Sequence, residues 1–317
     1  MQLVIISNRP HILKDTCERF NYYMSFISEI LVFVKDDRVH EFKNICKSIK
    51  NLKIISENYL LDDLNISKLT EYNSFPFKNH VKINYLLRKK ISYCDLVEKN
   101  FIMADDDFRP IKKIKKDFFL SDENKYSAFF TSSLPVWLKY SNVNFKKINE
   151  TDKKEYHPCL ISSIDEFILL KSLNFPTFMF ASHMPQIINK ELFKESVEFF
   201  EKYESKFILE EWNTYFNYIL HYHRDKVNLK LFETINWPSY QYDLNNSELH
   251  DCFVYFYTNK FSFENYYDSN DMYNMYNFGK IFEKIDEKFN EKYQTQIDNK
   301  KNKLLNQYIN KALRDPK

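Results

Sequence analysis

The stretch Lys99–Lys112, KNFIMADDDFRPIK, decides how the rest of this 317-residue chain is interpreted. Its mostly apolar run Phe101–Ala104 leads into three consecutive aspartates, and an aromatic residue, an arginine and a proline follow. A short apolar run that ends in turn-forming residues predicts a buried β-strand that reaches the surface. We therefore expect a strand here whose carboxyl end is acidic.

Asp105, Asp106 and Asp107 allow two interpretations. Three adjacent carboxylates repel one another unless a cation lies between them. Mg²⁺ or Mn²⁺ takes such hard oxygen ligands and commonly adds oxygens from a substrate phosphate. The alternative is a solvated acidic turn in which an aspartate caps the following segment. The triplet alone leaves both interpretations open.

Alternating strand and helix patterns before this stretch predict an α/β sheet. The strand patterns are Leu3–Ile6, Ile30–Val34 and Leu52–Ser56, and helical patterns at His11–Phe26 and Val39–Lys50 separate them. Such short alternation indicates parallel strands joined by right-handed crossovers. Ligands of open α/β sheets lie beyond the carboxyl ends of the strands. Ser7–Pro10 and the aspartates both follow strands, so we expect them close together.

Glycine is nearly absent from the chain, and Gly279 is its one example. This composition excludes the glycine-rich phosphate loops of the P-loop and GxGxxG types. Metal ions and side chains must then hold any diphosphate that binds. The net charge of +2 does not indicate a nucleic-acid partner. Hydrophobic residues make up 44% of the chain, which is enough for a sizeable core.

The cysteines and the apolar runs predict the compartment. Five scattered cysteines form no CxxC pair, which favours a reduced, cytosolic protein without a zinc site. The chain starts MQLVIISNRP, without the basic start of a signal peptide, and no run approaches the roughly 18–20 apolar residues of a membrane span. We expect a cytoplasmic protein, or one that is peripheral at the inner face of the membrane.

A basic helix is predicted shortly before the acidic strand, at Lys78–Ser92. Its charged face includes Lys82 and Arg88. A solvated helix face is the ordinary explanation for such charges. The functional alternative is that Lys82 or Arg88 approaches a diphosphate.

Another strand end carries His183. The apolar run Phe175–Ala181 predicts a strand, and an amphipathic pattern at Ile187–Tyr203 predicts the helix that follows. His183 lies between them, beyond the expected carboxyl end of the strand. It is therefore either a structural residue or one that faces a ligand.

The adjacent Glu210 and Glu211 open the next predicted helix. Acidic residues at a helix N-terminus interact favourably with the helix dipole, and this explains the pair without a function. The functional alternative is a general base beside aromatic residues that stack on a sugar ring. Four aromatic residues share roughly one face of this helix, as core or as binding surface: Trp212, Tyr215, Tyr218 and Tyr222.

The C-terminal part of the chain, 261–317, differs in pattern from the rest. An aromatic, asparagine-rich stretch leads into charged residues that alternate with apolar ones from Lys280 onward, which predicts one or two amphipathic helices. We expect an α/β domain at 1–260 followed by this helical extension. The helices would dock on the body, form a homo-oligomer, or lie peripherally on an anionic membrane.

Taken in order, the motifs resemble the GT-A glycosyltransferases, including those that build bacterial capsule and lipooligosaccharide. The opening strand with Ser7–Pro10 looks like their donor-binding loop, and Asp105–Asp107 looks like their DxD motif. Glu210-Glu211 resembles the acidic pair of inverting members. The resemblance covers about residues 1–260. It implies a Rossmann-like mixed sheet flanked by helices.

The resemblance also implies an activity: metal-dependent transfer of a sugar from a nucleotide-diphosphate sugar, UDP-linked, to a glycan or lipid-linked glycan acceptor in surface polysaccharide synthesis. The implied site residues are Asp107 and Asp105 as ligands of Mn²⁺ or Mg²⁺, Asn8, Arg9, Lys82, Arg88, Asp105 and Asp106 at the donor, Glu211 or Glu210 as general base, and His183 beside the acceptor or donor sugar. In the family a C-terminal loop often supplies a third metal ligand, and the candidates here are His250, Asp268 and Asp271.

Two other functions stay open at this point. A sugar-phosphate transferase similar to the Stealth type of capsule synthesis would use the same metal site and form a phosphodiester. A non-enzymatic binding module would carry the aspartates as a surface turn. No nucleic-acid partner is expected under any of these functions.

Overall fold

The computed structural model of this protein describes residues 1–61, 80–110, 112–140, 143, 156, 158–236 and 262–265. Its longer strands are β1 (Gln2–Ile6), β2 (Glu29–Val34), β3 (Leu52–Ser56), β4 (Asn100–Asp105), β6 (Tyr126–Phe130), β9 (Gln186–Asn189) and β10 (Val227–Leu231). The short ones are β5 (Phe108–Pro110), β7 (Ser132–Ser133), β8 (Phe178–Met179), β11 (Thr234–Asn236) and β12 (Phe263–Asn265). The helices are α1 (Pro10–Tyr23), α2 (Val39–Ile45), α3 (Asn58–Leu61), α5 (His80–Ile91), α6 (Leu134–Tyr140), α8 (Pro158–Ser172), α9 (Lys190–Phe200) and α10 (Glu211–Tyr222), with four 3₁₀ turns, η1 to η4.

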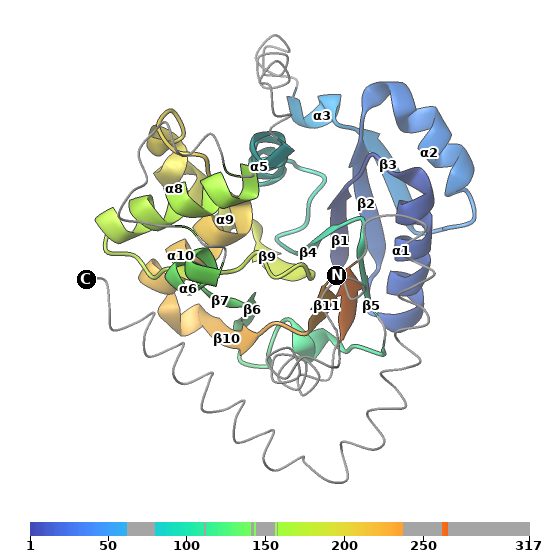
Figure 1. Ribbon diagram of the computed structural model, residues 1–317. Helices are drawn as coiled ribbons and strands as arrows, with labels where there is room; N and C mark the ends of the chain where they lie inside the picture. Colours follow the sequence, from blue (N-terminus) through green and yellow to red (C-terminus); the bar gives the residue numbers. More distant parts are fainter. Residues whose placement is uncertain are drawn as a thin grey trace, which may run out of the picture.

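A five-stranded sheet with the order β3-β2-β1-β4-β9 forms the centre of the fold (Figure 1). Strands β1 to β4 are parallel, and β9 pairs antiparallel with β4. The chain first builds outward from β1 through β2 to β3, and then returns to place β4 on the other side of β1. The carboxyl ends of β1 and β4 therefore flank a topological switch point, where open α/β sheets bind their ligands.

The central strands are buried because helices cover both faces of the sheet. Side chains of β1, β2 and β4 are buried at almost every position, as expected of parallel strands with near-continuous apolar sequence. Helices α1 and α2 lie on one side, and α5, α8, α9 and α10 lie on the other (Figure 1). The prediction of a Rossmann-like mixed sheet flanked by helices is confirmed. Within the described residues, no helix combines the length and apolar content needed to cross a membrane.

The helix predicted at Ile187–Tyr203 is wrong at its start. Gln186–Asn189 instead forms strand β9, which pairs with Asn100–Met103 of β4. Ile187 and Ile188 are β-branched, and they complete the open edge of a buried strand, which a helix start at this point would leave unpaired. Helix α9 begins at Lys190, where the Asn189 side chain accepts a hydrogen bond from the Leu192 amide at 3.0 Å.

The strand predicted at Phe175–Ala181 is reduced to the two residues of β8. The reason is that asparagine side chains of α10 replace a neighbouring strand. Asn217 accepts a hydrogen bond from the Phe178 amide at 2.9 Å, and Asn213 accepts one from the Phe180 amide at 2.6 Å. The amides of Phe178 and Phe180 are therefore satisfied by side chains, whereas the Met179 carbonyl accepts a backbone hydrogen bond from Thr131.

The predicted C-terminal helices, and the division of the chain at residue 260, fall almost wholly outside the described residues, which after position 236 comprise only 262–265. They remain predictions.

The buried Gln186 joins the central sheet to the two-stranded sheet of β6 and β10. Its amide oxygen accepts a hydrogen bond from the Phe129 amide at 3.1 Å, and its amide nitrogen donates to the Phe129 carbonyl at 2.7 Å. The same nitrogen lies 3.0 Å from the Ser182 hydroxyl. The Gln186 side chain thus makes the two hydrogen bonds to Phe129 that a neighbouring strand would otherwise make with β6.

Replacing Gln186 by leucine should lower the free energy of unfolding by about 2–4 kcal/mol, because buried backbone groups of Phe129 lose their partners. Urea unfolding followed by circular dichroism measures this. The matched control is Asn44→Leu at an exposed position of α2, which should change the free energy by about 0.5 kcal/mol or less. Equal effects of the two substitutions would contradict the assigned role.

Candidate functional site

The acidic rim, as we name Ser7, Arg9 and Asp105–Asp107, lies at the carboxyl ends of β1 and β4. The Ser7 hydroxyl donates a hydrogen bond to Asp106 at 2.5 Å, and the Arg9 guanidinium pairs with Asp106 and, at 3.0 Å, with Asp107. The predicted meeting of Ser7–Pro10 with the aspartates is therefore confirmed.

The middle aspartate of the triplet points inward. Asp106 is buried, its carboxylate binds Ser7 and Arg9, and its carbonyl accepts a hydrogen bond from the Thr16 hydroxyl of α1 at 2.5 Å. Sequence reasoning grouped Asp106 with the donor-binding residues. Its contacts instead fix the loop after β1 and the first turns of α1 against β4. We assign it a positioning role.

Asp105 meets Arg88 of α5, and Arg88 also pairs with Glu211 at the start of α10. Arg88 and Glu211 are only 4% and 2% exposed, so this ion pair is shielded from water. Burial lowers the pKa of Arg88 to about 10, although nearby carboxylates act in the opposite direction. The guanidinium carbon also lies 5.1 Å from the centre of the Trp212 ring. Three segments far apart in sequence thus meet at one arginine.

Glu210, which directly precedes Glu211, interacts with Glu166 of α8. The Glu210 carboxylate caps α10 by accepting a hydrogen bond from the Asn213 amide at 2.9 Å. Glu166 of α8 accepts from the Glu210 amide at 2.6 Å and from the Asn213 side chain at 2.8 Å. Burial raises the pKa of Glu210 to about 7, and burial together with the Glu210 charge raises the pKa of Glu166.

His183 lies in the connection from β8 to β9 with a left-handed backbone, φ 50°. Its ring meets the Phe108 ring edge to face, with centroids 6.2 Å apart. Burial lowers the pKa of His183 to about 4, so the imidazole is neutral at physiological pH. Because Phe108 directly follows Asp107, His183 reaches the segment next to the acidic rim.

Two further candidate residues are placed differently from the rest. Asn8 is exposed, and its carbonyl accepts a hydrogen bond from Arg38. Lys82 belongs to α5, but its side chain is outside the described part of the structure, as are all three candidates for a third metal ligand: His250, Asp268 and Asp271.

The residues of the acidic rim fit a hard divalent cation. Asp105 and Asp107 provide carboxylate oxygens, and each carboxylate can serve an arginine and a metal together because it has about four lone-pair sites. Two arginines lie among four carboxylates here: Arg9 pairs with Asp106 and Asp107, and Arg88 pairs with Asp105 and Glu211. Burial and the neighbouring Asp106 raise the pKa of Asp107 to about 6 despite Arg9. The described residues gather no cluster of three His, Cys, Asp or Glu ligands, so water or substrate oxygens would complete the coordination.

Sequence reasoning missed Glu166 and the structural use of Asn213 and Asn217. Glu166 lies in an apolar helix that was not predicted, and the adjacent carboxylates Asp165 and Glu166 in the sequence SSIDEFILLKS give no sign of their partners. Asn213 and Asn217 are four residues apart on α10, so they share one face of the helix. That spacing was the available signal.

Comparisons with known proteins give structural matches only. Neither a scan of protein-family models nor a search of curated proteins finds a match. The galactosyltransferase LgtC, solved with donor and acceptor sugar analogues, is 10% identical with a TM-score of 0.43, over 85% of this chain and 88% of that one. Mouse xyloside xylosyltransferase 1 is 11% identical with a TM-score of 0.40, over 86% and 99%. The 4-diphosphocytidyl-2C-methyl-D-erythritol synthase of Anaerococcus prevotii is 14% identical with a TM-score of 0.35, over 73% and 85%. Because these identities and TM-scores are low, the roles of residues in this chain are argued from its own geometry.

Replacing Arg88 by methionine should lower the free energy of unfolding by about 3–5 kcal/mol, because it leaves Glu211 buried without its cation. Denaturant unfolding measures the loss. The double variant Arg88→Met/Glu211→Leu should lose less than the sum of the single variants, by about 1–3 kcal/mol. The control Arg38→Met removes an exposed pair with Glu41 and should cost about 0–1 kcal/mol. A loss at Arg88 no larger than at Arg38 would contradict the buried pair.

Glu210 should make stability fall as pH rises. Its pKa is about 7 in the folded protein against about 4.5 when unfolded, so the folded state binds more protons between these values. The contribution of Glu210 to the free energy of unfolding is complete below pH 4.5 and lost above pH 7. The difference between the two pKa values corresponds to about 3 kcal/mol. The variant Glu210→Gln should show a smaller decline than the unmodified protein when both are unfolded in urea from pH 4.5 to 8, because Glu166 and Asp107, whose pKa values are also raised, still contribute. His183 acts in the opposite direction, but equally in both proteins. Parallel pH profiles would refute the assignment.

Proposed function

We propose that this protein is a metal-dependent glycosyltransferase that moves a sugar from a nucleoside diphosphate sugar to a glycan acceptor. The observation that carries the proposal is the acidic rim at the switch point between β1 and β4, with outer aspartates beside Arg9 and Arg88. Ligands of such sheets bind at this point. The resemblance of the sequence motifs to the GT-A enzymes supports the choice of sugar transfer.

The donor diphosphate is the ligand that suits this rim. A divalent cation bound by Asp105 and Asp107 would neutralise the charge that develops on the departing diphosphate. Arg9 is about one-third exposed, and it can hydrogen-bond a phosphate while remaining near Asp107. With no glycine loop in the chain, these side chains supply the phosphate contacts that backbone amides provide elsewhere.

Glu211 acts as a positioning residue in this proposal. Its ion pair with Arg88 and its burial leave it without access to an acceptor hydroxyl in this arrangement. It orients Arg88, which in turn orients Asp105. Glu210 is less buried than Glu211 and has the raised pKa that suits proton transfer near neutral pH, so it is the better candidate for the general base. His183 is neutral and borders the site, where it can accept or donate a hydrogen bond to a sugar hydroxyl.

Nucleotide sugars with and without Mn²⁺ should test the proposal in a thermal shift screen. One nucleotide class should stabilise the protein in the presence of Mn²⁺, by about 2.7 kcal/mol at a ligand concentration a hundredfold above Kd. Asp107→Asn should abolish the metal-dependent part and reduce turnover by about 100-fold or more. Asp122→Asn, the same change at an exposed carboxylate, should behave as the unmodified protein.

The products distinguish the remaining functions. Mass spectrometry of a reaction with a responding nucleotide sugar should show a glycoside, whereas a phosphodiester would identify a sugar-phosphate transferase. Binding without turnover on any glycan acceptor would support a binding module. The absence of any metal-dependent shift, or an equal shift in Asp107→Asn, would refute the role of the acidic rim.

A further inference from the structure

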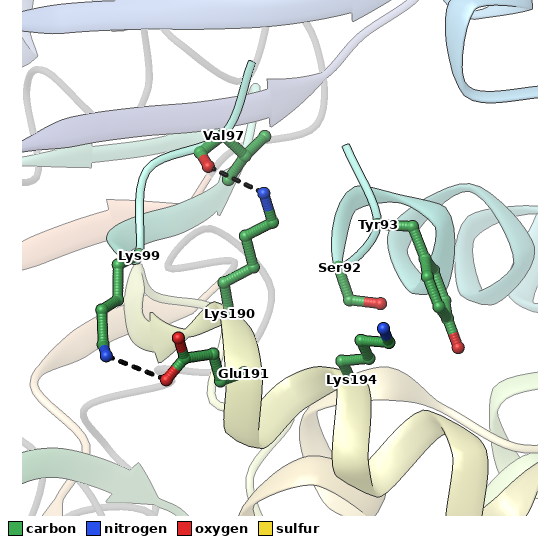
Figure 2. Close-up of a pocket in the computed structure, with 7 residues that line it drawn as sticks. All are labelled: Ser92, Tyr93, Val97, Lys99, Lys190, Glu191 and Lys194. Atoms are coloured by element: carbon green, nitrogen blue, oxygen red, sulfur yellow. Dashed lines mark hydrogen bonds and ion pairs between the residues drawn. The ribbon is translucent and has the colours of Figure 1, made fainter. Parts of the chain in front are cut away.

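A hollow of about 340 Å³ lies at the other end of β4 from the acidic rim. We name it the amino-edge pocket and define it by six of the residues that line it: Ser92, Tyr93, Lys99, Lys190, Glu191 and Lys194. They come from the turn that follows α5, the segment that enters β4 and the first turns of α9 (Figure 2). The length of β4 separates it from Asp105 by roughly 17 Å. The pocket is therefore distinct from the proposed reaction site.

The walls of the pocket are held by the backbone. The backbone amide of Lys190 donates a hydrogen bond to the Lys99 carbonyl at 2.8 Å. The side-chain ammonium of Lys190 donates to the Cys94 carbonyl and, at 3.1 Å, to the Val97 carbonyl. The start of α9 is thus joined to the segment between α5 and β4. A pocket with fixed walls does not need to be ordered when a ligand binds, which favours affinity.

The charges that line the pocket are mainly positive. Three ammonium groups and one carboxylate line the pocket, and that carboxylate, Glu191, pairs with Lys99 at 2.9 Å. A second carboxylate, Glu198, forms a hydrogen bond with Tyr93 beside the pocket. The hydrogen-bond partners of the Lys190 ammonium are neutral carbonyls. Lys194 is 3.8 Å from Glu198, and both side chains are about half exposed, so that pair is weak. Lys190 and Lys194 therefore remain able to bind an anionic group.

An aromatic ring borders the same charges. Tyr93 is 47% exposed, and the Lys194 ammonium lies 5.2 Å from its ring centre. Figure 2 shows Tyr93 and Lys194 on one side of the pocket, the Lys99–Glu191 pair on the other, and Lys190 between them. An exposed ring can pack against the C–H face of a sugar, while the ammonium groups hold an acidic substituent.

We infer that the amino-edge pocket binds a sugar unit that carries an acidic group, either a carboxylate or a phosphate. The acidic group accepts hydrogen bonds from Lys190 and Lys194, and the ring of the sugar packs on Tyr93. A volume of about 340 Å³ lies at the lower end of the range for small-ligand sites. An adjoining hollow of about 420 Å³ shares Lys99 and Glu191 with it, which gives room for a neighbouring sugar unit. The inference involves none of the residues of the proposed reaction.

Calorimetric titration of the full-length protein should test this with four probes: methyl glucuronide, glucose 6-phosphate, methyl glucoside and inorganic phosphate. At least one of the two sugar acids should bind at least about tenfold more tightly than the neutral glucoside, and the tighter one identifies the acidic group. Lys194→Gln should weaken that sugar acid by about tenfold, because it removes a charge at nearly unchanged length. Tyr93→Ala should weaken the sugar acid and leave inorganic phosphate unaffected.

Two controls separate this site from others. Lys47→Gln, at an exposed position in the turn that follows α2, should not alter binding, and neither should Asp107→Asn. Loss of binding in Asp107→Asn would place the signal at the acidic rim and overturn the inference, whatever the outcome for the proposed function. Equal affinity for methyl glucoside, equal affinity for inorganic phosphate, or no binding of either sugar acid below about 10 mM would also overturn it.

Discussion

The ion pair of Arg88 with Asp105 and Glu211 is the constraint on which the arrangement of the site depends. Arg88 comes from α5, Asp105 from the end of β4, and Glu211 from the start of α10. Arg88 and Glu211 are buried, and each is stabilised by the other because an isolated buried charge is strongly disfavoured, while the partly exposed Asp105 pairs with the same guanidinium. The position of α10 relative to the sheet is therefore tied to the state of the acidic rim.

The near absence of glycine gives this ion pair a further consequence. A glycine loop would bind phosphates through backbone amides and leave side-chain charges free for other uses. In this chain the phosphate contacts of the proposed reaction fall to Arg9 and Arg88, which already bind the aspartates. The same arginines thus hold the aspartates in place before a ligand arrives and face its phosphates afterwards. Asp106 stabilises this arrangement by accepting hydrogen bonds from the hydroxyl groups of Ser7 and Thr16.

The sequence predicted the parts of the fold that repeat a local pattern. Strands β1 to β4 and helices α1, α5 and α10 follow apolar periodicity, and the carboxyl ends of β1 and β4 meet as the topology rules require. Strand β9 was missed because Ile187 and Ile188 fit a helix as well as a strand, and only the open edge of β4 decides between them. The site residues divide in the same way, into those that local patterns predict and those that depend on packing. Arg9 and the aspartates were placed by topology, whereas the partners of Arg88 and Glu210 depend on packing between α5, α8 and α10, which no local pattern encodes.

Charge balance indicates how ligands would enter the acidic rim. The two arginines, Arg9 and Arg88, are outnumbered by the carboxylates they pair with, Asp105, Asp106, Asp107 and Glu211, so a diphosphate alone would meet repulsion. A divalent cation would offset this excess of carboxylates, and the diphosphate could then interact with both the arginines and the cation. Because Arg88 is buried and Arg9 is about one-third exposed, Arg9 is the arginine that can turn toward the phosphates at lower cost. Cation and diphosphate are therefore expected to bind cooperatively, with Arg88 keeping Asp105 and α10 in register while Arg9 changes partners.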